Sequence, residues 1–503
     1  MIAEFLSVPV ELLCSGFMLF TEHIFKLSED KDSFTGELPV DCTQFNADDT
    51  LSEEFENPRN STDTSTWREN RPAMKVSLKK SAWFAFQVTV LTGGFIGVGC
   101  IFFIYFQMKI IFVCDWKALR DSSIPLEKKR PRIIGESYLA STLYLWQPLM
   151  LLFVFRWPLI KQVNLVTFTL IGIFFDLAYR FLVAVYGLYY PPWIPYPLNI
   201  LYLIMILVQS FSVGRIFRGN IFSASLFGFK LCAQFIIGAP VFCLFASVLC
   251  PLFAHLEGIL KVAMIALSYS VGIIPKILSK RCVSGLYVIN PGFSYVLVST
   301  ASSAVCMAVK FMLAEFKSLW AFIALSIGEQ TIHLVYQLIV KAGESHEDKS
   351  QYERILLSGL EADPTGPFSA AKMKERRSQR LAADLTIHEM MSSAAAVVLS
   401  VRLMTVYGII HRILRPEEYQ EMIVDLLIRI VLALLVEIMF NVIFVMMLTR
   451  TRNIPVLKVW NVKWKSHLIV CIVTVYMIVN YYANKILLIL STLHEAEGKI
   501  DNC

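Results

Sequence analysis

The sequence predicts an all-α membrane protein that crosses the bilayer several times, and three observations support this fold class. Hydrophobic residues make up 56% of the 503-residue chain and charged residues only 17%. The mean hydropathy is +0.58. About ten runs of roughly 18 or more apolar residues occur, the length that a helix needs to cross the hydrocarbon core. The net charge of +6 is spread over the loops and does not indicate a nucleic-acid partner.

The N-terminal part of the chain changes from apolar to acidic. The first stretch lacks a basic n-region and contains Glu4 and Glu11, which favours an interfacial helix over a signal peptide. Residues 29–66 offer few apolar side chains to bury, so we expect disorder there. Asn60 begins a glycosylation sequon, a triplet that is also common by chance. Use of Asn60 would place residues 1–80 outside the cell.

Apolar segments then alternate with polar or basic loops. The first segment contains closely spaced glycines, which suit tight helix packing. No strand precedes these glycines, so they do not indicate a dinucleotide-binding loop. The candidate segments are 83–106, 137–155, 163–189, 196–213, 224–250, 258–275, 293–313, 318–340, 393–411, 422–448 and 467–490.

Two topologies fit the distribution of basic residues. If every segment crosses and the N-terminus is inside, about 25 flanking Lys and Arg lie inside and about 11 outside. If the N-terminus is outside and 293–313 and 467–490 do not cross, the count is about 20 against 16. Charge alone favours the first topology, but it does not distinguish a crossing segment from a re-entrant one.

Several ionisable residues lie inside apolar segments, where each charge needs a partner or a wet cavity. Three pairs are spaced four residues apart and so share a helical face. Mutual neutralisation is the simpler interpretation of each pair, whereas a proton relay is an alternative for Glu329 and His333. The intramembrane candidates are Asp176, Arg180, Glu329, His333, Arg402, Asp425 and Arg429, together with Lys230 and Glu437.

Motifs for enzymes and metal sites are missing. The sequence "HEMMS" at His388 has Ser392 where a zinc protease has its second histidine. No Walker loop, GxSxG element or kinase motif set occurs. The 11 cysteines form no CxxC pair, so they predict neither a zinc site nor a disulfide framework. We therefore expect no enzyme and no cofactor.

The stretch "SVGIIPKILSKRCVSGLYVINPGFSY" (270–295) resembles the receptor for retinol uptake, the stimulated-by-retinoic-acid family. In that family a similar element ends a membrane span, and the loop after it engages the retinol-binding protein. The matching positions here are Tyr287 and Gly292, followed by Phe293; Ser294 stands where the family has a second glycine. The strings "RPRIIGE", "VAVYGLYYPP", "RNIPVLKVW" and "VYMIVNYYANKILL" agree with the family in order.

The resemblance implies about nine crossing helices, an outside N-terminus, a non-crossing segment and a re-entrant C-terminal segment. It divides the chain into an extracellular region 1–80, membrane helices 81–340, a cytosolic linker 341–385 and membrane helices 386–503. The binding loop would be 276–317, with its three positive charges as an exception to the positive-inside rule or as a carrier-facing patch. It also implies a homodimer in the lipid bilayer and calmodulin binding, for which 372–380 is the candidate.

The expected function is that of a plasma-membrane receptor and passive transporter for retinol or a similar apolar ligand, delivered by an extracellular carrier protein. Two alternatives belong to other classes. The first is an ion- or proton-coupled transporter that uses Asp176, Glu329, His333 and Arg402. The second is a signalling receptor with docking sites at 372–380 and 450–465.

Overall fold

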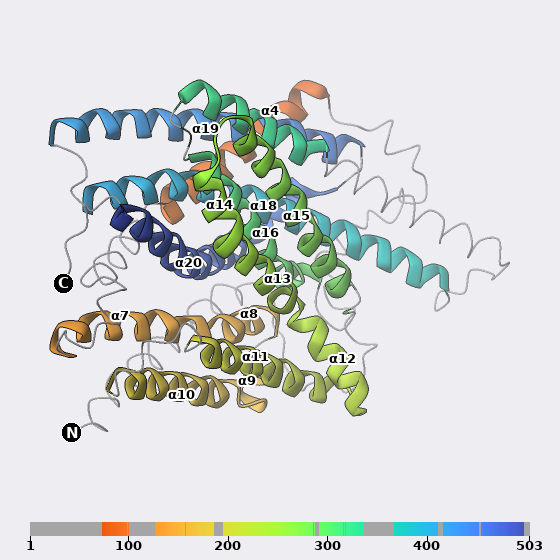
Figure 1. The fold of residues 1–503 in the computed structure, drawn as a ribbon. Helices are drawn as coiled ribbons and strands as arrows, with labels where there is room; N and C mark the ends of the chain where they lie inside the picture. The colour runs from red at the N-terminus through yellow and green to blue at the C-terminus, as the bar shows by residue number, and fades with distance from the viewer. Residues whose placement is uncertain are drawn as a thin grey trace. The chain divides into compact units, whose positions relative to one another are not determined.

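The protein was studied as a computed structural model, which describes most of the chain after residue 72. The N-terminal region with Asn60, and Tyr287 in the expected binding loop, lie outside the described residues. The described residues form helices joined by turns and contain no strand, which confirms the all-α class (Figure 1). They are 73–97, 99, 126–155, 157–185, 195–284, 286, 291–314, 316, 318–335, 367–410, 416–451 and 454–496.

In the described part of the chain, 7 helices are long and apolar enough to cross a membrane. Shorter apolar helices, Ile221–Leu231 and Leu319–Val335, accompany them. The protein is therefore a polytopic membrane protein, as predicted. The candidate spans are Ile133–Val154, Leu165–Leu182, Ile200–Phe217, Ile259–Ser284, Val296–Ala314, Val424–Arg450 and Val456–Asn480.

The helices of the first half form two groups. Helix α10 packs against both α7 and α11, with α8 and α9 joining α7 to α10 (Figure 1). Helix α4 instead packs against α19, from the far end of the sequence. The bounds are α4 (Met74–Leu91), a π-helix η1 (Thr92–Gly97), α7 (Leu126–Tyr144), α8 (Trp146–Val154), α9 (Trp157–Gln162), α10 (Leu165–Val185) and α11 (Pro195–Phe217).

The segment 224–250, expected as one span, is broken into successive pieces. Helix α12 (Ile221–Leu231) ends at a turn at Cys232 and is followed by α13 (Ala233–Leu244), a π-helix η2 (Phe245–Leu249) and α14 (Cys250–His255). The break has a packing reason, because α12 lies mainly on α11 whereas α13 lies on α15 and α16. The prediction of a single continuous helix was wrong.

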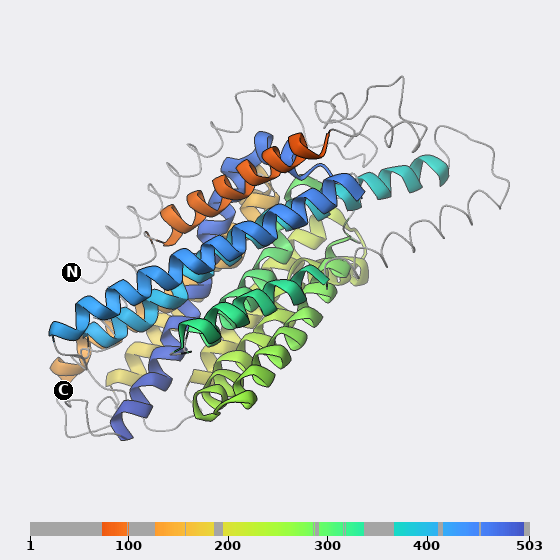
Figure 2. The ribbon, with the colours of Figure 1, turned by 90° about the horizontal axis from the view of Figure 1, so that it is seen from above.

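The second half supplies the central helices. Its elements are α15 (Ile259–Ser284), a 3₁₀ turn η3 (Pro291–Phe293), α16 (Val296–Ala314), the helix Leu319–Val335, α18 (Pro367–Ile410), α19 (Pro416–Thr451) and α20 (Val456–Ala496). Seen from above, many of these helices run side by side along a shared direction (Figure 2).

Helices α16 and α18 form the core. Of the apolar window of α16, 94% is buried, so this helix faces protein rather than lipid. The side chains of α18 are buried from Arg380 to Ser400, apart from half-buried Leu385 and Glu389. Both helices are rich in Ser and Ala where they meet, and small side chains let helix backbones approach closely.

The sequence suggested that the apolar segment 258–275 ends at Pro275. Helix α15 instead continues through this proline to Ser284. A helix tolerates an internal proline when packing compensates for the lost hydrogen bond. Here Ser279 and Val283 are buried after the proline. The range 276–317 is therefore not a loop throughout, because α15 and α16 occupy most of it.

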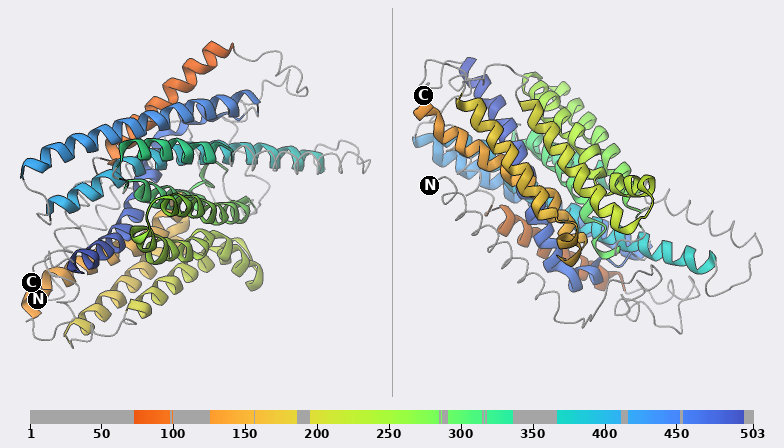
Figure 3. Two further views of the ribbon diagram at one scale, coloured as in Figure 1. Left: turned by 45° about the horizontal axis from the view of Figure 1, so that its top comes forward. Right: turned by 90° about the horizontal axis from the view of Figure 1, so that it is seen from below.

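Two further ranges are helical where the sequence left other options. Helix α18 begins at Pro367, inside the range assigned to the linker 341–385, and its first turns extend past the neighbouring helices (Figures 2 and 3). Residues 467–490, expected as a re-entrant segment, lie within the single helix α20, which is kinked at Lys463. The stretch 372–380 thus lies on the extended part of α18.

Candidate functional site

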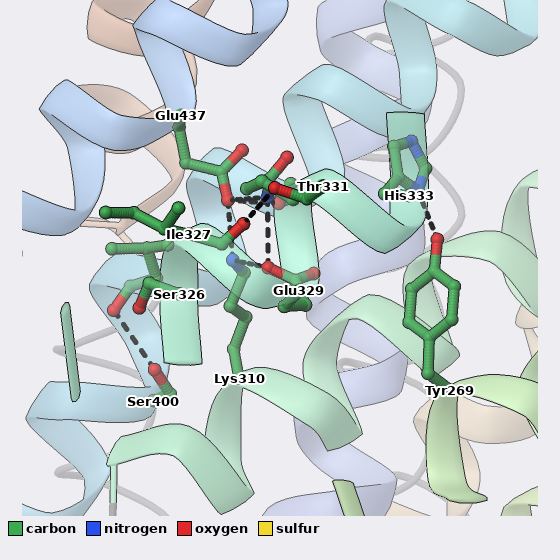
Figure 4. A network of polar contacts seen from close by, with 12 residues as sticks. Tyr269, Lys310, Ser326, Ile327, Glu329, Thr331, His333, Ser400 and Glu437 are labelled. Atoms are coloured by element: carbon green, nitrogen blue, oxygen red, sulfur yellow. Dashed lines mark hydrogen bonds and ion pairs between the residues drawn. The ribbon is translucent and has the colours of Figure 1, made fainter. Parts of the chain in front are cut away.

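A buried ammonium group with two carboxylates lies where four helices meet. Lys310 on α16 places Nζ 2.6 Å from Oε2 of Glu329 and 2.6 Å from Oε1 of Glu437 on α19 (Figure 4). Gln330 donates from Nε2 to Glu437 at 2.5 Å and to Glu329 at 3.1 Å. Ser393 on α18 donates to Glu437 at 2.8 Å. We call Lys310, Glu329 and Glu437 the Lys310 triad.

The charges of the Lys310 triad do not balance. Two ionised carboxylates and one ammonium leave one negative charge, and the three side chains are only 2–6% exposed. A net charge in a low-dielectric interior is costly, so the triad is best accommodated with one further positive charge. A proton on one carboxyl group or a bound monovalent cation would supply it.

A second polar cluster adjoins the triad. Lys276 on α15 lies 3.4 Å from Oε1 of Glu389 on α18, which also accepts from Ser302 at 3.1 Å. His333 places Nε2 3.8 Å from Oε2 of Glu389, and its Nδ1 lies 2.6 Å from the hydroxyl of Tyr269 (Figure 4). The Lys276–Glu389 pair is neutral by itself, in contrast to the triad.

The structure confirms two of the three predicted pairs and shows that the third was wrong. Arg180 lies 2.5 Å from Asp176, and Arg429 lies 2.7 Å from Asp425. Arg429 also donates to the carbonyl of Phe316, so it joins α19 to another segment. Glu329 and His333 share a helix but bind different partners, because one faces Lys310 and the other faces Tyr269 and Glu389.

Two of the residues expected to bind a carrier are packed into the protein, whereas Arg281 in the same loop range is exposed. Gly292 is buried, and Phe293 is half-buried with Nζ of Lys463 4.9 Å from its ring centroid. Lys276 is not part of a carrier-facing patch, because it is 7% exposed and paired with Glu389. Residues 287–290, Tyr287 among them, lie outside the described residues, as does the side chain of Arg402.

The sequence alone did not identify most of the residues that pair with these buried charges. Lys310 stands near the end of an apolar segment, and Glu389 was considered only as part of "HEMMS". His388, the first residue of that sequence, places Nε2 3.0 Å from Oγ of Ser303. The available signal was the spacing on α18, which places Arg380, Asp384 and His388 on one face. In the described residues, no group of His, Cys, Asp and Glu could hold a metal ion.

Comparison with known proteins gives no match to a family model, a curated protein or a solved structure.

Proposed function

We propose that this protein is a proton-coupled membrane transporter in which the Lys310 triad binds and releases the coupling proton. The observation that carries the proposal is the uncompensated negative charge of a triad buried among α16, α18, α19 and the helix Leu319–Val335. Intramembrane carboxylates that are not fully neutralised are typical of proton and ion pathways. The neutral pairs elsewhere lack this property.

Glu329 is the proton acceptor in this proposal. Oε1 of Glu437 lies within hydrogen-bonding distance of Lys310, Gln330 and Ser393, and three donors on one oxygen stabilise its ionised form. In the described part of the chain, the carboxylate of Glu329 accepts hydrogen bonds from Lys310 and Gln330 only. An added proton therefore disturbs fewer hydrogen bonds at Glu329 than at Glu437.

The test is a pH jump on reconstituted liposomes adsorbed to a capacitive electrode. Proton entry into a buried site moves charge, so the wild-type protein should give a transient current without any added substrate. Glu329→Gln fills the same space but takes up no proton, and the current should be lost. Glu257→Gln, at an exposed carboxylate, is the matched control and should keep it. A wild-type protein without a current, or an equal current in Glu329→Gln, would overturn the proposal.

The second candidate is the plasma-membrane retinol receptor and transporter. Its support is the resemblance of 270–295, and the fact that α15 is joined to α16 through the short segment carrying Gly292 and Phe293. Uptake of labelled retinol by cells expressing the chain, with and without carrier protein, tests this candidate. Saturable uptake that ignores external pH and runs both ways would favour it over proton coupling.

A further inference from the structure

A polar row runs along α18 on the face toward α16 and α20. Its members are Arg380, Asp384, His388 and Ser392, each four residues after the last, so they lie on one helical face. At 1.5 Å per residue the row is about 18 Å long, more than half the thickness of a hydrocarbon core of about 30 Å. All four side chains are at most 8% exposed. Among the described side chains of α18, Arg380 is the first that is buried, after half-buried Gln379.

The first part of the row is centred on Asp384. Arg380 donates from Nε to Oδ2 of Asp384 at 2.9 Å, and Nε2 of His467 on α20 lies 3.0 Å from Oδ1. The ring of Tyr295 lies next to both histidines, with its centroid 4.5 Å from that of His467 and 6.0 Å from that of His388. Tyr295 therefore stands between the first and second parts of the row.

The second part leads to the Lys310 triad. Nε2 of His388 lies 3.0 Å from Oγ of Ser303, which lies 2.6 Å from Oγ of Ser392. The next residue on α18, Ser393, donates to Glu437. Polar groups thus continue from Asp384 to the triad, with one break between the histidine rings and another between Ser392 and Ser393.

The two histidines have the same unusual bonding. Each uses Nε2 for a hydrogen bond, whereas Nδ1 of each is buried and makes no well-formed hydrogen bond to the described residues, although the ring of His388 also lies near the backbone of Ser299. A buried polar atom left without a partner is unfavourable, so each of these two nitrogens is a candidate to bind a water molecule or a proton. An imidazole can accept a proton on one nitrogen while it releases a proton from the other.

We propose that His467 and His388 relay protons along α18 to the Lys310 triad, an inference that rests on the proposed proton-coupled function. Asp384 is ionised in its pair with Arg380, so it first takes up a proton at the start of the row and then passes it from Oδ1 to Nε2 of His467. The ring releases its Nδ1 proton to a bridging water beside Tyr295. That water protonates Nδ1 of His388, whose Nε2 proton goes to Ser303. Ser303 releases its own proton to Ser392, and a second water carries one from Ser392 to the triad. Each group gains one proton and loses one, so Asp384 returns to its ionised form beside Arg380.

Other titratable groups around the histidines fit this role. Arg380 and Asp384 form an ion pair, so the entrance is neutral, and Glu389 is paired with Lys276. Tyr295 lies beside both rings, and Cys471 is a neighbour of Tyr295. Protonation of either histidine thus adds a positive charge that Asp384 and Glu389 partly compensate.

The relay is tested with the pH-jump current, which gives both the amount of charge that enters the triad and the rate of entry. His388→Gln and His467→Gln keep a polar side chain but cannot exchange protons in this way. The charge moved should stay as in the wild type while the rate falls about 10²-fold, the scale of a lost general acid–base group. Ser303→Ala, a small change in a helix core, should slow entry with the same unchanged charge. Ser81→Ala, at a buried serine of α4 outside the row, is the matched control and should not slow it.

Each outcome decides the relay. Unchanged rates in all three variants would overturn it while leaving the proton-coupled function intact. Loss of the moved charge in the histidine variants and in Ser303→Ala would show a structural role and also overturn it. A wild-type protein without any current would overturn the proposed function itself.

Discussion

Nζ of Lys310 lies 2.6 Å from Oε1 of Glu437, and this contact joins α16 to α19 in the interior of the bundle. Because Glu329 shares the same ammonium group, removal of the lysine and removal of a carboxylate have opposite effects on the buried charge. The first leaves two uncompensated negative charges, whereas the second makes the triad neutral. The sign of each substitution's effect on stability follows from this difference.

Lys310→Met should destabilise the protein strongly. Breaking a buried ion pair by removing one partner costs about 3–5 kcal/mol, because the remaining charge is uncompensated. The melting temperature of the purified protein should fall at neutral pH and recover in part at acidic pH, where the carboxyl groups take up protons. Glu437→Gln, which makes the triad neutral, should lower the melting temperature much less. Equal losses for both variants would show that charge balance is not what stabilises the triad.

Glu389→Gln should behave differently from Glu437→Gln although both replace a glutamate that is paired with a lysine. Glu389 is the carboxylate of a one-to-one pair with Lys276, so its neutralisation leaves a buried positive charge. We expect a loss of about 1–3 kcal/mol. Adding Lys276→Met to Glu389→Gln should recover part of it. Thermal melting of the single and double variants measures this coupling, and strict additivity of the two losses would count against it.

Much of the architecture was predictable because membrane spans depend on local composition. The apolar lengths predicted the all-α class, and spacing by four predicted the Asp176–Arg180 and Asp425–Arg429 pairs, since partners on one helix follow from helix geometry alone. The triad was not predictable in this way. Its members come from three separate helices, and only packing brings Lys310 to Glu437. The same limit explains Pro275, whose effect on α15 depends on what the next turns pack against.

Asp384→Asn should destabilise the start of the polar row. Among the described residues, Asp384 is the only carboxylate that pairs with Arg380. It also binds His467. Neutralising it leaves the buried guanidinium without its counter-charge, at a cost of about 3–5 kcal/mol. Asp384→Asn combined with Arg380→Gln should melt at a higher temperature than Asp384→Asn alone. If the double variant melts lower, the pair is held by contacts other than its charges.

Gly272→Ala should separate α15 from α16, because a Cβ at this position would lie 2.3 Å from Cγ1 of Val305 and 2.8 Å from Cγ2. Overpacking of a tight core typically costs about 1–3 kcal/mol. The obstacle is a side chain, so Val305→Ala should relieve it, and the double variant should be more stable than Gly272→Ala.

Gly214→Ala offers a contrast, since its Cβ would lie 2.4 Å from the backbone oxygen of Ala224, which no side-chain change removes. Gly328→Ala meets no atom within 4 Å and should melt at or slightly above the wild-type temperature. Failure of Val305→Ala to rescue Gly272→Ala would mean that the two helices do not approach at this point.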